Sequence, residues 1–143
     1  MSERRRTNLA RLLVGVVFVW NVQCALAFLI NPEDYATSFE LEGTVGLAMM
    51  QSVGVLFLMW NVPYAVALWQ PVRHRTALYE AVVMQAIGVA GESWILWGLG
   101  TEHAALRSSL TRFIWFDAAG LILLLTAVWL VWRIPKNATG ANG

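Results

Sequence analysis

The stretch FIWFDAAGLILLLTAVWLVW, residues Phe113–Trp132, decides the fold of this chain. At a rise of ~1.5 Å per residue, a helix of this length matches the ~30 Å hydrocarbon core of a bilayer. Asp117 is the one charged residue within it. The stretch therefore predicts a membrane-spanning helix. Because an ionisable group inside a bilayer usually faces a bundle interior or a wet cavity, Asp117 also marks a candidate functional position.

Three further stretches are comparably long and apolar, which gives four predicted spans: Asn8–Ile30, Gly43–Trp69, Ala77–Leu99 and Phe113–Trp132. Of the 143 residues, 58% are hydrophobic and 13% are charged, whereas a soluble domain of this size needs more polar surface. The loops are too short to hold a second domain. We therefore expect an all-α integral membrane protein with a single domain at residues 1–136. This domain is predicted to be a four-helix transmembrane bundle, followed by a flexible cytoplasmic tail at residues 137–143.

The basic residues predict the orientation of the bundle. Eight of them precede or open the first span, separate the second from the third, or follow the fourth: Arg4, Arg5, Arg6, Arg11, Arg73, Arg75, Arg133 and Lys136. The opposite side has only Arg107 and Arg112, together with an acidic stretch between the first two spans. The positive-inside rule then places both termini in the cytoplasm. We expect the cytoplasmic membrane of a bacterium or archaeon.

The first external loop predicts a short helix. Asn31 is a suitable N-cap, Pro32 suits the first helical position, and Glu33 and Asp34 supply negative charge to the first turn. We expect a helix from Pro32 to Leu41 that lies along the outer membrane surface.

Each predicted span carries a polar side chain at a similar depth, roughly 6–12 Å from its outer end at ~1.5 Å per residue. These side chains are Gln23, Gln51, Glu92 and Asp117. Gln85 shares a helix face with Glu92, and Asn61 lies beside Pro63, where a kink is expected because proline lacks an amide hydrogen. We take Gln23, Gln51, Asn61, Gln85, Glu92 and Asp117 as the candidate ligand- or proton-binding residues.

The last two spans should pack antiparallel, which brings Glu92 and Asp117 to the same depth. Two facing carboxyl groups in a low dielectric cannot both stay ionised cheaply, so the pair could share a proton, bind a cation or accept a proton from a substrate. Alternatively, one of them forms a structural ion pair with Arg107 or Arg112, which lie near the outer edge.

Several chemistries are not expected. The single cysteine, Cys24, cannot form an internal disulfide, and the two histidines, His74 and His103, lie in loops on opposite sides of the predicted membrane. This spacing suits neither a bis-histidine haem nor a zinc site. The sequence has no phosphate-binding glycine loop, no nucleophile motif and no nucleic-acid footprint. We therefore expect no cofactor, no metal and no nucleic-acid partner.

These features predict a small non-enzymatic membrane protein. It would bind, and could move, a small or amphipathic ligand or a proton at the buried amide and carboxylate layer. One alternative is an accessory or structural subunit of a larger membrane complex, or a homo-oligomer, assembled through glycine-rich helix faces at Gly43, Gly46 and Gly54 or at Gly88 and Gly91. Another is a membrane enzyme acting on a lipid or quinone, with one carboxylate as general base. In every case the lipid bilayer is the expected surrounding partner.

Overall fold

The computed structural model describes residues 1–134, and these residues form helices and no strands. Four helices are long: α1 (Glu3–Ile30), α3 (Gly43–Trp69), α4 (Arg75–Gly98) and α5 (Ala104–Trp132). Between α1 and α3 lie the short helix α2 (Pro32–Ala36) and a single 3₁₀ turn, η1 (Thr37–Phe39). The predicted tail of residues 137–143 lies outside the described residues, as do the last two residues of the predicted domain.

All four long helices are long and apolar enough to cross a membrane. The predicted all-helical class and the four candidate transmembrane helices are therefore confirmed, and they are compatible with an integral membrane protein. The largest difference is in α5, which begins at Ala104 and not at Phe113. The apolar run marks only the part of this helix that suits lipid. The preceding residues include Ala, Leu and Arg, which favour a helix equally well in water.

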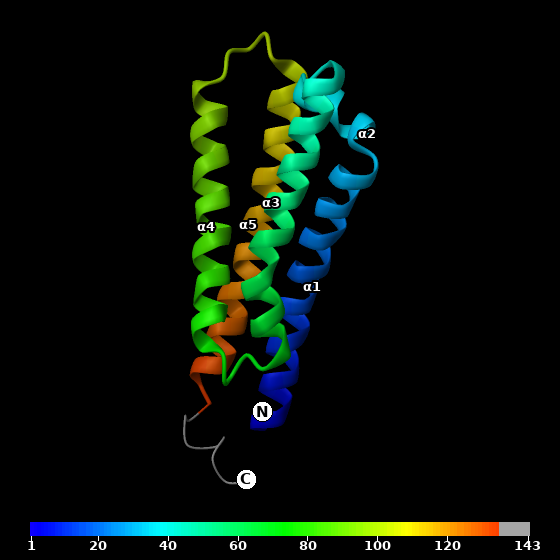
Figure 1. Cartoon of the computed structure of the whole chain (residues 1–143). Coiled ribbons are helices and arrows are strands. Elements are labelled where there is room, and N and C mark those ends of the chain that lie inside the picture. Colours follow the sequence, from blue (N-terminus) through cyan, green and yellow to red (C-terminus); the bar gives the residue numbers. More distant parts are fainter. Residues whose placement is uncertain (135–143) are drawn as a thin grey trace.

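The long helices pack along one another in a closed order. Helix α1 contacts α3 and α5, and α4 contacts the same two helices from the other side. Figure 1 shows that α1 begins and α5 ends at the same end of the molecule. A hydrogen bond of 3.0 Å from Arg6 Nη1 to the carbonyl oxygen of Arg133 joins these two ends.

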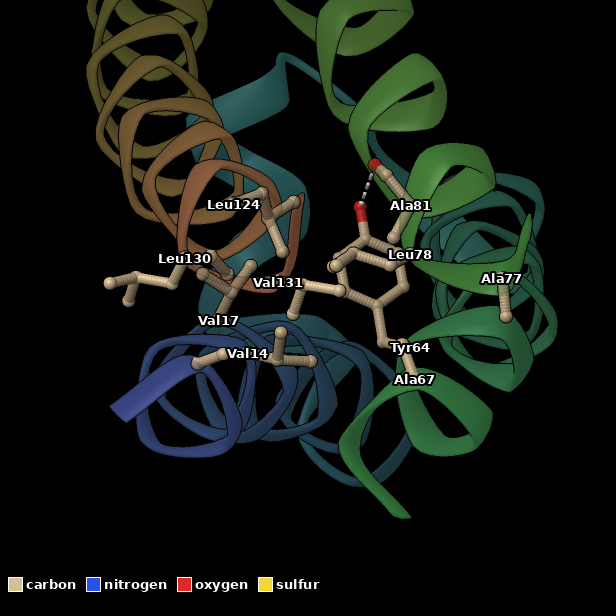
Figure 2. Close-up of a cluster of buried hydrophobic side chains, with 12 residues drawn as sticks. Val14, Val17, Tyr64, Ala67, Ala77, Leu78, Ala81, Leu124, Leu130 and Val131 are labelled. Carbon is tan, nitrogen blue, oxygen red and sulfur yellow. Dashed lines mark hydrogen bonds between the residues drawn. The ribbon is translucent and has the colours of Figure 1, made fainter. Parts of the chain in front are cut away.

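The main hydrophobic core lies in the half of the molecule that contains the start of α1, and Figure 2 shows its side chains. Small and branched side chains from all four long helices form it, including Val14, Ala67, Leu78 and Leu124. Tyr64 is the one aromatic residue within this core, and its hydroxyl group points toward the carbonyl oxygen of Ala81 at 3.2 Å. The core therefore lies nearer to the start of α1 than the polar side chains that are described in the next subsection.

An aromatic cluster lies in the other half. The ring of Phe28 packs against Tyr35, Phe39, Phe57 and Phe113, with centroids 5.1–6.0 Å apart. Because Tyr35 and Phe39 come from the short segment after α1, these contacts hold that segment over the ends of the long helices.

The predicted helix Pro32–Leu41 is shorter than expected and has two parts. The chain leaves the helical path at Glu40, which has a φ of 56°. The amide of Leu41 then turns back to the carbonyl oxygen of Ala36 at 2.9 Å. A left-handed residue followed by such a back-turned hydrogen bond is a common way to end a helix.

Candidate functional site

A row of hydrogen-bonded polar side chains crosses three of the long helices, with Gln85 of α4 at its centre. Gln85 is 3% exposed. Its Oε1 accepts a hydrogen bond of 2.6 Å from the hydroxyl group of Tyr64 on α3. Its Nε2 donates a hydrogen bond of 2.8 Å to Oδ1 of Asp117 on α5. The amide of Gln85 therefore links α3 to α5, with its oxygen toward Tyr64 and its nitrogen toward Asp117.

Two glycines make room for this row. A Cβ atom at Gly88 of α4 would collide with Oδ2 of Asp117. A Cβ atom at Gly120 of α5 would lie 2.9 Å from Nε2 of Gln85, which is also too close. The bare backbone at both glycines therefore leaves room for the hydrogen bond between Gln85 and Asp117. Small residues play this part in many transmembrane helix contacts.

A small cavity of about 30 Å³ lies beside the row. Asn21 of α1 and Asn61 of α3 line it together with Tyr64, Gln85 and Asp117. Each long helix thus contributes a polar side chain to the lining of one small space. By volume it admits about two water molecules, since one needs roughly 10–15 Å³ on this measure.

Asn61 leaves one hydrogen-bonding atom of this cavity unsatisfied. The residue is 4% exposed, and its Nδ2 donates to the carbonyl oxygen of Phe57 at 2.7 Å. Its Oδ1 is buried and has no hydrogen-bond partner in the described part of the chain. An unpaired buried amide oxygen is costly, so it is a natural acceptor for a water or a small cation in the cavity.

Glu92 lies one helical turn from Gly88, toward the end of the molecule that carries α2. Its Oε2 is buried and has no hydrogen-bond partner among residues 1–134. The carboxyl group of Asp117 is its acidic neighbour. Two carboxyl groups therefore occupy adjoining levels of α4 and α5, while no hydrogen bond joins them within the described residues.

Neither carboxyl group forms an ion pair with arginine among the residues described. Arg107 donates to the carbonyl oxygens of Leu96 and Leu99, and Arg112 donates to the hydroxyl group of Ser109. The structural ion pair with Arg107 or Arg112, considered above as an alternative, is not seen among the described residues. Arg107 satisfies carbonyl groups at the end of α4, and Arg112 bonds a side chain of its own helix. Neither arginine is a partner of the two acidic side chains among the described residues.

Two of the predicted site residues do not join the others. Gln51 is exposed, and its Nε2 donates to the carbonyl oxygen of Leu29 at 3.2 Å. Gln23 is exposed on the surface of α1. Similar depth does not determine which way a side chain points, because each residue turns the helix by ~100°. Of the six predicted positions, the structure brings together Asn61, Gln85 and Asp117, with Glu92 beside them.

Asn21 and Tyr64 belong to the site but were not among the predicted site residues. Asn21 lies four residues after Val17, which is 1% exposed, so it continues the buried face of α1. Tyr64 follows Asn61 by three residues on the buried face of α3. Both could have been predicted from one pattern, a tyrosine or asparagine on the same helical face as several small apolar residues.

A larger cavity, of about 310 Å³, lies between the row and α2. Its wall is mainly aromatic, with Phe28, Phe39, Phe113 and Phe116, and Arg112 also lines it. Cys24 is on the wall as well, and Phe116 of the wall is the residue next to Asp117 in α5. The aromatic cavity therefore reaches toward the carboxyl groups from the end that carries α2.

At this end of the molecule, a hydrogen bond joins the α1–α3 connection to the α4–α5 connection. His103 Nδ1 lies 2.6 Å from Oε2 of Glu40, and the other oxygen of Glu40 accepts a hydrogen bond from the amide of Leu106 at 3.3 Å. The bond from His103 lowers the pKa of Glu40 below its ordinary 4.5. The same bond raises the pKa of His103 above its ordinary 6.5.

No family model, no curated protein sequence and no solved structure matches this chain. Within the described range, no group of three or more His, Cys, Asp or Glu side chains could hold a metal ion. Function therefore has to be inferred from the chemistry of the site itself.

Proposed function

We propose that this chain is a small non-enzymatic membrane protein that binds a proton or another small polar species at the row formed by Tyr64, Gln85 and Asp117. The four long helices act as a transmembrane bundle with both termini in the cytoplasm of a bacterium or archaeon. The segment α2–η1 lies at the outer membrane surface. The asymmetric placement of basic residues supports this orientation, since cytoplasmic loops carry an excess of Lys and Arg.

The observation that carries the proposal is the state of Asp117. Its Oδ1 accepts a hydrogen bond from one amide, and among the described residues it has no ion-pair partner. A carboxyl group inside a membrane span is costly, by ~2.5–3.5 kcal/mol or more, and such groups usually mark proton or ion pathways. A proton or a monovalent cation can neutralise Asp117, and either can enter a space of about 30 Å³.

The size of the space separates this ligand from an amphipathic one. A cavity of about 30 Å³ cannot take an acyl chain or a ring system, whereas the aromatic cavity of about 310 Å³ can take a small one. We place any amphipathic ligand in the aromatic cavity, above the row. There its polar end would lie toward Cys24, on the side of the two carboxyl groups.

The alternative, a subunit of a larger membrane complex, has its own supporting observation in α4. This helix is the least buried of the four long helices. Trp94 and Trp97 are 72% and 82% exposed, and Gly91 and Gly98 face open space. Exposed glycines allow another helix to approach closely, so this face suits a partner helix.

Carboxyl infrared spectroscopy of the protein in nanodiscs tests the proton-binding role. We expect a carboxyl C=O band that titrates with pH, disappears in Asp117→Asn and shifts in Gln85→Leu, where its hydrogen-bond donor is lost. Glu33→Gln is the control, because Glu33 is exposed at the start of α2. If Asp117→Asn leaves every titrating carboxyl band unchanged, Asp117 takes up no proton and the proposal fails.

A second measurement separates binding from structural assembly. Proteoliposomes loaded with a pH-sensitive dye report proton entry after an external pH jump, with Asp117→Asn as the comparison. In parallel, Trp97→Ala tests the exposed face of α4 by the mass of the purified assembly. The subunit alternative would be favoured if Trp97→Ala changed the mass of the assembly while Asp117→Asn left the carboxyl band unaltered.

A further inference from the structure

Two surface hollows meet at Arg11, at the end of the molecule where α1 begins. The first is an open groove of about 650 Å³ along α1. Apolar side chains dominate its wall: Leu12, Val16, Val19, Trp20 and Leu68. The second hollow, of about 390 Å³, lies at the ends of α1 and α3. It contains three arginines, Arg4, Arg11 and Arg73, and a single acidic residue, Glu3.

The junction between the two hollows is built by specific contacts. Arg11 lines both of them, and its Nε donates to the carbonyl oxygen of Leu68 at 3.1 Å. This bond fixes the base of the guanidinium group at the point where the apolar wall gives way to the basic one. Gly15 gives the groove its depth, because a Cβ atom there would lie 3.3 Å from Leu68 Cδ1.

We propose that these two hollows together bind one anionic phospholipid. Its phosphate lies among Arg4, Arg11 and Arg73, and one acyl chain lies along the groove beside Val16 and Val19. The site rests on the transmembrane placement of the helices, but not on any role for Asp117.

Charge and polarity select this occupant over others. The basic hollow has three arginines against one glutamate, so an anionic headgroup offsets part of the excess positive charge and a zwitterionic headgroup offsets none. Guanidinium groups bind phosphate with paired hydrogen bonds. Basic pockets at the cytoplasmic end of transmembrane helices are common sites for anionic headgroups. A free phosphate would match the arginines and leave the groove empty, whereas a partner helix would fill the groove and leave the arginines unmatched.

The probe is dioleoylphosphatidylglycerol, added to the full-length protein in detergent micelles, with dioleoylphosphatidylcholine as the zwitterionic lipid of equal chains. Bound lipid is counted by native mass spectrometry, and the melting temperature is followed in parallel. We expect the anionic lipid alone to bind with one-to-one stoichiometry and to raise the melting temperature. Arg11→Gln and Arg73→Gln should each weaken binding about five-fold, as expected for one basic residue at an anionic headgroup.

Arg5→Gln is the matched control for charge, because Arg5 is exposed near the same helix end and lines neither hollow. Val19→Trp tests the groove by filling it, with Val62→Trp as its control. These two valines are similarly exposed, at 58% and 61%, and Val62 lies outside the groove. We expect only Val19→Trp to weaken binding of the anionic lipid.

Three results would overturn the proposal. One is equal binding of the two lipids. Another is an effect of Arg5→Gln as large as that of Arg11→Gln, which would reveal only general surface charge. The third is an equal rise in melting temperature with inorganic phosphate alone, which would assign the arginines to a free anion. None of these outcomes alters the carboxyl band of Asp117, so failure here is distinguishable from failure of the proton-binding role.

Discussion

Replacing Gln85 with Leu tests whether the buried row holds the helices together. The change removes two hydrogen bonds between helices, one of 2.6 Å from Tyr64 and one of 2.8 Å to Asp117, while the volume of the side chain stays similar. Hydrogen bonds between transmembrane helices contribute ~0.6 kcal/mol on average and ~1.7 kcal/mol at most. Two such bonds give a predicted loss of roughly 1–3 kcal/mol in the free energy of unfolding.

The structure also predicts how the loss is shared. In Gln85→Leu the hydroxyl group of Tyr64 can still donate to the carbonyl oxygen of Ala81 at 3.2 Å, so Asp117 is the residue left without its partner. Tyr64→Phe should lower the free energy of unfolding by about 1 kcal/mol, because it removes the hydroxyl group that donates to Gln85. In the double variant the shared bond is lost only once. The two effects should therefore sum to more than the measured double effect, by about 0.6–1.7 kcal/mol.

The assay is reversible unfolding in mixed micelles at increasing fractions of sodium dodecyl sulfate, followed by circular dichroism. Gln23→Leu is the control, since it makes the same substitution at an exposed glutamine of α1. Two results would refute the reasoning: a Gln85→Leu variant that is no less stable than Gln23→Leu, or a double variant that is additive within ~0.3 kcal/mol. Either would mean that the row does not exist in the folded protein.

Three other predictions follow from single contacts. Gly88→Ala should lower the melting temperature because the new methyl group collides with the carboxyl group of α5, whereas Gly91→Ala, which faces open space, should raise stability by up to ~1 kcal/mol in the same melting experiment. The bond between His103 and Glu40 should hold the two connections together best between about pH 4.5 and pH 6.5, the ordinary pKa values of the two groups. Because the pKa of His103 is raised, its contribution to stability is complete below pH 6.5 and is lost as the pH rises through the raised value. Because the pKa of Glu40 is lowered, its contribution to stability is complete above pH 4.5 and is lost as the pH falls through the lowered value. Hydrogen exchange of the α4–α5 connection across this range checks it, and an exchange rate that does not change with pH would contradict it. Reporter fusions should read cytoplasmic in the α3–α4 connection and external at α2, and the opposite pattern would overturn the orientation.

The four long helices can be predicted from the sequence because each one corresponds to a continuous run of apolar residues. A run of about 20 apolar residues is visible without knowing any contact. The rotation of each helix is a different matter. A transmembrane helix is apolar on the side that faces lipid as well as on the side that faces its neighbours, so hydrophobic periodicity does not separate the two faces.

Two similar segments illustrate this limit. Gln51 precedes Gly54 by three residues, and Gln85 precedes Gly88 by three residues. Both glycines are close-contact positions, since a Cβ at Gly54 would lie 2.9 Å from the carbonyl oxygen of Ala25 and one at Gly88 would collide with Asp117. Yet Gln85 is buried and Gln51 is exposed. The glycine fixes only where the backbones approach. The partner helix decides whether the neighbouring glutamine turns inward.

The choice between a free carboxyl group and an ion pair depends on what else needs the arginines. Helix α4 ends at Gly98, and the last carbonyl groups of any helix lack amide partners within it. Arg107, near the start of α5, donates to the carbonyl oxygens of Leu96 and Leu99 and so satisfies that end. The sequence contains the same arginine and the same acidic residues, but it does not reveal this competing demand. Because the end of α4 takes the guanidinium group of Arg107, this group does not pair with Glu92 or Asp117. The two carboxyl groups have no basic partner among the described residues, and the proposed proton site depends on this property.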